Sequence, residues 1–172
     1  PWMSIGYETQ IPPISTLTFY NTIANNGKMM RPRFVSKVMK NGETIMEFPP
    51  EVMRQQIAKE RSIKELQTIL EQVVSVGLGK KAGSPNFKVA GKTGTAQISK
   101  GAGGYKSGGT SYLISFAGYF PADAPRYSCI VCIQKSGLPA SGGTMCGKVF
   151  HQISEGIMAQ SLKVDVKDRK SV

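Results

Sequence analysis

Residues 87–99 read FKVAGKTGTAQIS, and this extended run is predicted to be a strand of a sheet. In a strand Thr93 and Thr95 share one face, with about 7 Å between them, and Gly94 leaves room for a ligand to approach. Lys92 adds a positive charge beside the two hydroxyls. Such a ledge suits an anion, which is either a phosphate or the carboxylate of a peptide.

A phosphate loop is not predicted here. The Walker pattern G-x-x-x-x-G-K-S/T would end at Gly91, Lys92 and Thr93, but Asn86 stands where its first glycine is needed. Thr95 continues an extended run, whereas a phosphate loop is followed by a helix. The stretch GLGKKA at 77–82 imitates a dinucleotide-binding loop but follows a predicted helix, which indicates a helix end and a turn.

Two further strands are predicted on the C-terminal side. SYLISFAGYF at 111–120 and RYSCIVCIQK at 126–135 are apolar on both faces, so each is expected to be a buried strand. The turn PADAP joins them, and GAGGYKSGGT at 101–110 is expected to be a mobile glycine-rich loop. Three strands with such connections predict an antiparallel meander with packed helices, an α+β fold.

Helices are predicted on both sides of these strands. PPISTLTFYNTIANNG at 12–27 has proline at its first turn and glycine at its end. Two apolar stripes at helical spacing follow, the first capped by Ser62 or a neighbour: Ile63, Leu66, Leu70, Val73 and Gly77, then Cys146, Val149, Phe150, Ile153 and Ile157. Asn41-Gly42 predicts a hairpin between two short strands, and the polar tail 163–172 is expected to fray.

The composition is that of one globular domain with a real core: 172 residues, of which 40% are hydrophobic. No run of 18 apolar residues predicts a membrane span, and the chain opens on Pro1 without a signal-peptide pattern. We therefore expect a piece of a longer protein. The net charge of +11 suggests an anionic partner, but the basic residues are scattered, so nucleic acid is not expected.

The cysteines do not predict a metal site. Cys129, Cys132, Cys146 and His151 occur in the order of zinc ligands. However, Cys129 and Cys132 fall inside a predicted strand, where their Cα atoms lie about 10 Å apart and face opposite ways. We expect small buried thiols, no metal and no cofactor, and we expect His151 at a helix surface or at the edge of the core.

The stretch VAGKTGTAQ resembles the Lys-Thr-Gly box of penicillin-binding proteins, the D,D-transpeptidases that cross-link peptidoglycan. Residues 6–35, residues 114–135 and the helix beginning near Thr144 resemble the segments around that box in the class B, FtsI-like enzymes. The resemblance implies that residues 1–162 are the C-terminal portion of a penicillin-binding protein/β-lactamase-like transpeptidase domain. Residues 163–172 remain a polar tail outside it.

The resemblance also implies roles for single residues. Lys92 would support the hydrogen-bond network around the nucleophile, and Thr93 and Thr95 would bind the carboxylate of a D-Ala-D-Ala stem peptide or of a β-lactam. The Thr95 N–H would be an oxyanion donor. Gly94 would keep the strand approachable, and Gln97 would lie on the rim of the cleft.

The chain departs from the family because it contains no Ser-x-x-Lys box, whose serine is the nucleophile. No serine is followed three residues later by lysine, and the single Ser-x-Asn match, Ser84-Pro85-Asn86, is interpreted as a chance match in a turn. Both boxes are expected upstream, so the isolated chain is expected to be inactive and to oligomerise or be poorly stable. The parent would stand at the periplasmic face of the cytoplasmic membrane, anchored by an upstream segment, with division proteins among its partners.

Two other functions stay open on the sequence alone. A β-lactamase-related hydrolase also carries Lys-Thr-Gly, although residues 6–35 do not resemble that family. A non-catalytic module that binds an anionic cell-wall polymer would fit the charge of +11.

Overall fold

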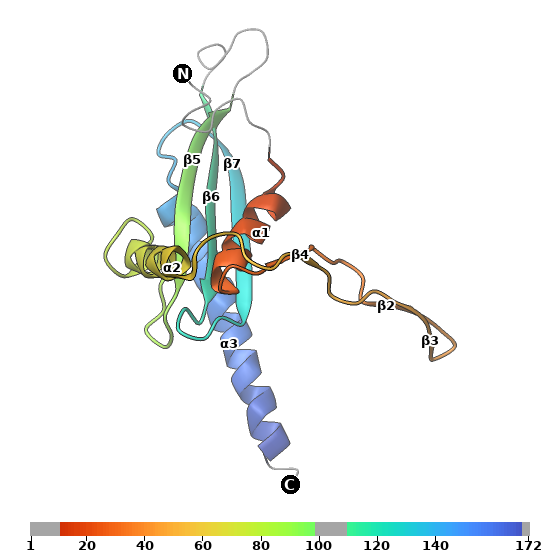
Figure 1. The fold of residues 1–172 in the computed structure, drawn as a ribbon. Coiled ribbons are helices and arrows are strands. Elements are labelled where there is room, and N and C mark those ends of the chain that lie inside the picture. The colour runs from red at the N-terminus through yellow and green to blue at the C-terminus, as the bar shows by residue number, and fades with distance from the viewer. Residues whose placement is uncertain (1–10, 99–109, 170–172) are drawn as a thin grey trace.

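The centre of the molecule is a three-stranded antiparallel sheet (Figure 1). The structure, a computed structural model, describes residues 11–98 and 110–169, with side chains up to residue 161. The strands are β5 (Ala90–Ile98), β6 (Ser111–Phe120) and β7 (Tyr127–Ser136), in the order β5-β6-β7. The predicted α+β fold and meander are confirmed. All but the last residue of the predicted glycine-rich loop, 101–110, lies outside the described residues.

The register of the sheet is unbroken from one end to the other. Gly94 of β5 lies opposite Ser115 of β6, and Ser115 lies opposite Cys132 of β7. Because side chains alternate between the two faces of a strand, Thr93, Thr95 and Gln97 share one face of β5.

Helices cover both faces of this sheet. Helix α1 (Pro13–Ala24) and helix α2 (Glu60–Ser75) lie on one face, and α3 (Gly147–Arg169) lies on the other (Figure 1). The core under α1 and α2 consists of Ile23, Leu70, Ala90 and Tyr119. The larger core under α3 consists of Val74, Ala82, Val89, Ile114, Phe116, Phe120, Cys146 and Phe150.

The predicted helices are confirmed, but their bounds and buried faces differ in part; in the last helix, Val149 and Ile153 of the predicted stripe are exposed. Helix α1 has proline at its start, and Gly27 beyond its end has a φ of +94°. Helix α2 begins earlier than expected, since Lys59 rather than Ser62 is its N-cap residue and no side chain caps it. The buried residues of α2 are Ile63, Leu70 and Val74. Val74 rather than the predicted Val73 is buried in the core, and Leu66 is exposed. Helix α3 continues to Arg169, beyond the start of the predicted polar tail.

The prediction that β7 is buried on both faces is wrong. Its residues are half-buried or exposed, because β7 is an outer strand of the described sheet, and α1 and α3 leave part of its surface open to solvent. For the same reason the cysteines are not all buried as expected: Cys146 is buried, Cys129 is half-buried and Cys132 is exposed. His151 is half-buried as expected, and its Nδ1–H donates to the Gly83 carbonyl at 2.8 Å.

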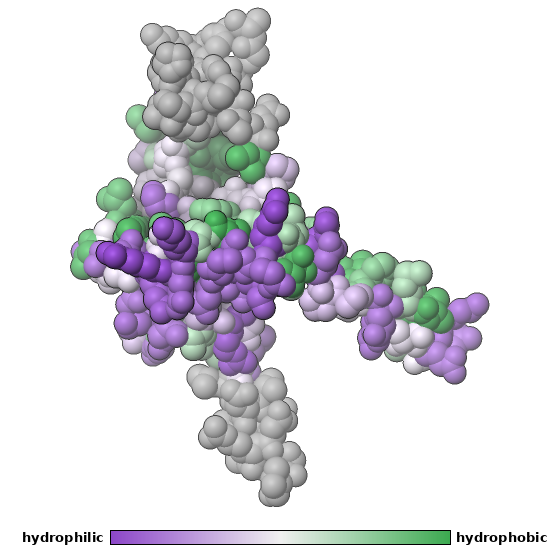
Figure 2. Space-filling model, in the orientation of Figure 1, coloured by the Kyte–Doolittle hydropathy of each residue, from purple (hydrophilic) through white to green (hydrophobic). Residues whose placement is uncertain are grey.

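Residues 29–54, which we call the arm, project away from the sheet (Figure 1). The arm contains β1 (Met29–Met30), β2 (Lys37–Lys40), β3 (Glu43–Glu47) and β4 (Val52–Arg54). The predicted hairpin is confirmed, since Asn41 and Gly42 turn the chain with φ angles of +52° and +86°. Every residue of β2 and β3 is exposed, and hydrophobic side chains follow the length of the arm (Figure 2).

The packing of Tyr119 predicts a pH dependence of stability. Burial, with a smaller contribution from the Glu71 carboxylate, raises the pKa of Tyr119 to about 12. The stability that this group contributes is therefore complete below pH 10 and is lost as the pH rises towards 12, because only the unfolded chain ionises in that window. At about 1.4 kcal/mol per pKa unit, we expect a loss of about 1–3 kcal/mol.

Urea denaturation at pH 9 and at pH 11.5 measures this loss. We expect Tyr119→Phe to reduce the difference in unfolding free energy between the two pH values. An equal difference in the wild type and in Tyr119→Phe would contradict the assignment.

Candidate active-site strand

The outer edge of β5 carries main-chain groups that β6 does not use. In the described sheet β5 pairs only with β6. The Gly137 N–H donates at 2.8 Å to the carbonyl of Thr110, the residue immediately before β6, so Thr110 and every second residue after it bond towards β7. Ser115 therefore bonds towards Gly94. It follows that the N–H and C=O groups of Thr93 and Thr95 point away from β6, to the open side of the strand.

The side chains of Thr93 and Thr95 are available at this edge. Thr93 is half-buried and Thr95 is exposed. Neither hydroxyl hydrogen-bonds another residue of the described ranges. Two unpaired hydroxyls beside outward N–H groups form a set of donors for an anionic or carbonyl oxygen.

Lys92 places its charge at the same edge. Its exposed side chain curls back so that Nζ donates to the Thr93 carbonyl at 2.9 Å. That carbonyl is one of the outward-pointing groups, so the ammonium lies at the open side of β5. The contact is local and exposed, and an incoming partner can replace it at small cost.

Gly94 and Gln97 complete the residues that the sequence singled out. A Cβ atom on Gly94 would overlap the Ser115 hydroxyl oxygen, so the Ser115 side chain would have to rotate to admit one. Gln97 lies opposite Tyr112, on the face that Thr93 and Thr95 share, and is half-buried. The structure thus gathers Lys92, Thr93, Gly94 and Thr95 at one open edge, with Gln97 further along the strand.

Sequence reasoning missed the turn behind this edge. Residues Gly142–Cys146, here η4, form one turn of π-helix that packs against β5 and β6 before α3 begins. The signal was the run Ser141-Gly142-Gly143, a capping serine followed by two glycines immediately before the predicted helical stripe.

The single Ser-x-Asn match lies before β5 and is engaged elsewhere. The Ser84 hydroxyl donates to the Glu155 carboxylate of α3, and the Asn86 amide donates to the same carboxylate at 3.2 Å. The Asn86 N–H also donates to Ser84 Oγ at 2.9 Å. These bonds tie the loop before β5 to α3.

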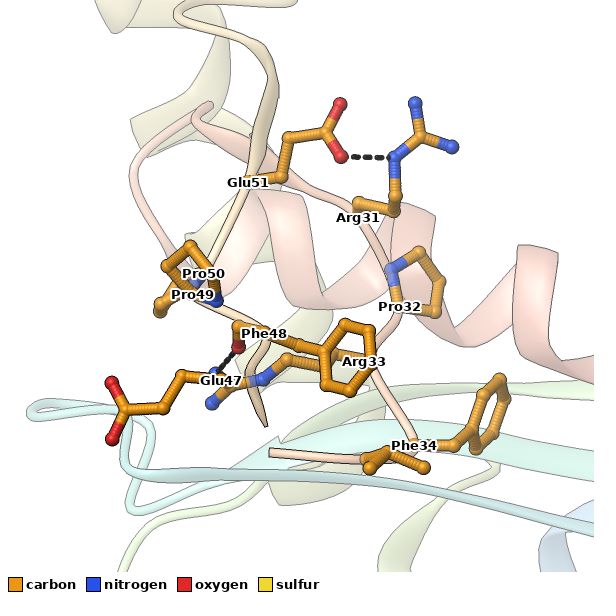
Figure 3. Close-up of a pocket in the computed structure, with 10 residues that line it drawn as sticks. Arg31, Pro32, Arg33, Phe34, Glu47, Phe48, Pro49, Pro50 and Glu51 are labelled. Carbon is orange, nitrogen blue, oxygen red and sulfur yellow. Dashed lines mark hydrogen bonds and ion pairs between the residues drawn. The ribbon is translucent and has the colours of Figure 1, made fainter. Parts of the chain in front are cut away.

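A hollow of about 600 Å³ lies within the arm, between residues 31–35 and residues 47–51 (Figure 3). Both of its arginines already make hydrogen bonds, since Arg31 Nε donates to the Glu51 carboxylate at 2.7 Å and Arg33 donates to the Phe48 carbonyl. None of its lining residues belongs to β5, so it is separate from the candidate edge.

No group of three or more histidine, cysteine, aspartate and glutamate side chains in the described residues could hold a metal ion. Cys129 and Cys132 lie three positions apart in β7, so their side chains face opposite sides of the sheet. Among the helices in the described part of the chain, none combines the length and hydrophobicity that a membrane-spanning segment needs.

Comparison with known proteins identifies the family of the chain. The sequence profile of the family described as "Penicillin binding protein transpeptidase domain" matches residues 2–155. Penicillin-binding protein PbpB of Mycobacterium tuberculosis is 30% identical over 167 residues, which are 91% of this chain and 24% of that protein. Stage V sporulation protein D of Bacillus subtilis is 29% identical over 174 residues, 98% of this chain and 25% of that protein.

Solved structures agree in fold. Penicillin-binding protein 3 of Mycobacterium tuberculosis complexed with aztreonam superposes with a TM-score of 0.76 at 29% identity, over 92% of this chain and 37% of that one. The D,D-transpeptidase domain of a peptidoglycan glycosyltransferase from Eggerthella lenta gives 0.67 at 26% identity, over 91% of this chain and 35% of that one. The chain spans about a quarter of the length of the curated relatives that it matches.

Proposed function

Because this chain belongs to the penicillin-binding protein transpeptidase family, we propose that its parent protein is a peptidoglycan D,D-transpeptidase. The parent cross-links stem peptides by acyl transfer through a seryl-enzyme, and it binds β-lactams. This chain contributes the strand that holds the substrate.

The open edge of β5 carries the proposal. Along residues 92–95 it presents an ammonium, two hydroxyls that bond no other residue in the described ranges, and outward main-chain N–H groups. An extended peptide can pair with such an edge through its main chain, and its terminal carboxylate can meet the hydroxyls. The same edge accepts a carboxylate-bearing β-lactam.

The proposed roles follow the chemistry of each group. Thr93 and Thr95 donate their hydroxyls to the substrate carboxylate, and the Thr95 N–H donates to the carbonyl oxygen as negative charge develops on it. Lys92 leaves the Thr93 carbonyl and stabilises the deprotonated nucleophile. Gly94 lets the peptide approach, and Gln97 lines the rim.

The nucleophile is proposed to lie in the parent outside this chain. A serine activated by lysine in a Ser-x-x-Lys box is absent from these 172 residues. The upstream part of the domain supplies it, and an upstream segment anchors the parent at the periplasmic face of the membrane. Division proteins and D-Ala-D-Ala stem peptides are the partners that this assignment implies.

Intact-mass spectrometry after incubation with a reactive penicillin tests the proposal. We expect one covalent penicillin on the longer gene product, at a serine upstream of Pro1, and none on residues 1–172 alone. Rapid turnover of the penicillin without an adduct would favour a β-lactamase-related hydrolase. No adduct and no turnover, with salt-sensitive binding to an anionic wall polymer, would favour a binding module.

A further inference from the structure

A pair of glycines lies directly behind the candidate edge. The Ser141 side chain accepts a hydrogen bond from the Thr144 N–H at 3.2 Å and so fixes the start of η4. Turns of π-helix are rare and are frequently found at functional sites. Gly142 and Gly143 are both buried, whereas Thr144 beside them is exposed.

Gly142 rests on the main chain of the sheet. A Cβ atom at this position would overlap the carbonyl oxygens of both Gly94 and Ser115, and it would lie 3.2 Å from the Gly94 nitrogen. All three are main-chain atoms of paired strands, so they cannot rotate aside as a side chain could. Any side chain at position 142 must lift η4 from the sheet or displace β5.

Gly143 touches the neighbouring residue of the same strand. A Cβ atom there would overlap the Leu78 carbonyl oxygen and would lie 3.2 Å from Cγ2 of Thr93. The Thr93 methyl group therefore packs against bare backbone, which orients its hydroxyl in another direction. Because threonine has few χ1 rotamers, holding the methyl group also holds the hydroxyl.

We propose that Gly142 and Gly143 are positioning residues for the acyl-transfer reaction, an inference that rests on the proposed function. They form a fixed support behind Thr93–Thr95, which in the described sheet pair with another strand on one side only. The support keeps β5 from yielding when a ligand pairs with its open side. It thereby sets the distance between the Thr95 N–H and the carbonyl that the nucleophile attacks.

A small shift of this support has a large expected effect. A misplacement of about 1 Å in a catalytic geometry can lower the rate by about 100-fold. An alanine at position 142 cannot be accommodated by a side-chain movement, so we expect a displacement of that order. The loss should fall on the rate constant of acylation more than on the affinity of the first, noncovalent complex.

Stopped-flow acylation of the longer protein by a fluorescent penicillin separates these quantities. The variants are Gly142→Ala and Gly143→Ala, with Gly156→Ala as the control because nothing lies within 4 Å of a Cβ there. We expect the acylation rate constant of Gly142→Ala to fall by about 100-fold and that of Gly156→Ala to equal the wild type. A purely structural role would reduce the amplitude of acylation and leave the rate constant of the folded fraction unchanged.

Thr93→Ser tests the same support without any overlap, since it removes only the methyl group that packs on Gly143. We expect a loss of about 10-fold in its rate constant, at an unchanged melting temperature. If the folded fractions of Gly142→Ala, Gly143→Ala and Thr93→Ser all acylate with the wild-type rate constant, this inference is overturned and the proposed function stands. Absence of acylation in the wild type would overturn the proposed function, and this inference with it.

Discussion

Replacing Lys92 by alanine in the longer protein is expected to lower the rate of acylation by penicillin by about 10²–10⁴-fold. The Lys92 ammonium lies at the open side of β5, where it donates to the Thr93 carbonyl at 2.9 Å. Without it, the proposed nucleophile loses the positive charge that stabilises its deprotonated form. Single-turnover acylation kinetics measure the loss.

Lys135→Ala is the matched control. Lys135 is a lysine of β7 whose Nζ likewise donates to nearby carbonyls, at 3.2 Å to Ser136 and 3.3 Å to Gly137. It lies on the strand furthest from β5, so we expect its removal to leave the rate unchanged. Equal rates for Lys92→Ala and the wild type would remove Lys92 from the mechanism.

Replacing Phe116 by alanine is expected to destabilise the fold by about 3–5 kcal/mol. The Phe116 ring is fully buried, with its centroid 4.8 Å from that of Phe150 in α3. It also covers bare backbone, since a Cβ atom on Gly91 would lie 2.7 Å from Cζ of the ring. The ring therefore joins α3 to the first residues of the candidate strand.

Chemical denaturation of the longer protein measures this effect, with Phe34→Ala as the control. Phe34 of the arm is 85% exposed, so we expect its removal to change the stability by less than about 0.5 kcal/mol. A loss for Phe116→Ala as small as that for Phe34→Ala would contradict the placement of the core.

The elements that follow from local chemistry were predictable. Asn41-Gly42 defined its hairpin because few other residues adopt positive φ at both positions of the turn. The strands β5, β6 and β7 followed from their apolar and β-branched runs, and the shared face of Thr93 and Thr95 followed from the alternation of side chains in a strand.

The remainder depends on contacts between distant segments. The composition of β7 is that of a buried strand, yet its exposure depends on which strands and helices lie beside it. The contact of Gly142 in η4 with Gly94 in β5 joins two elements whose sequences carry no mutual signal. Likewise, the direction of the Thr95 N–H depends on the phase of the β5–β6 ladder, which a single strand does not reveal.

A crystal structure of the longer protein acylated by penicillin tests the central claim most directly. We expect the penicillin carboxylate within hydrogen-bond distance, about 2.7–3.2 Å, of the Thr93 and Thr95 hydroxyls. We also expect its carbonyl oxygen to accept from the Thr95 N–H, with the ligand lying along the open side of β5. An acylated structure in which this edge is empty and the carboxylate binds elsewhere would contradict the account.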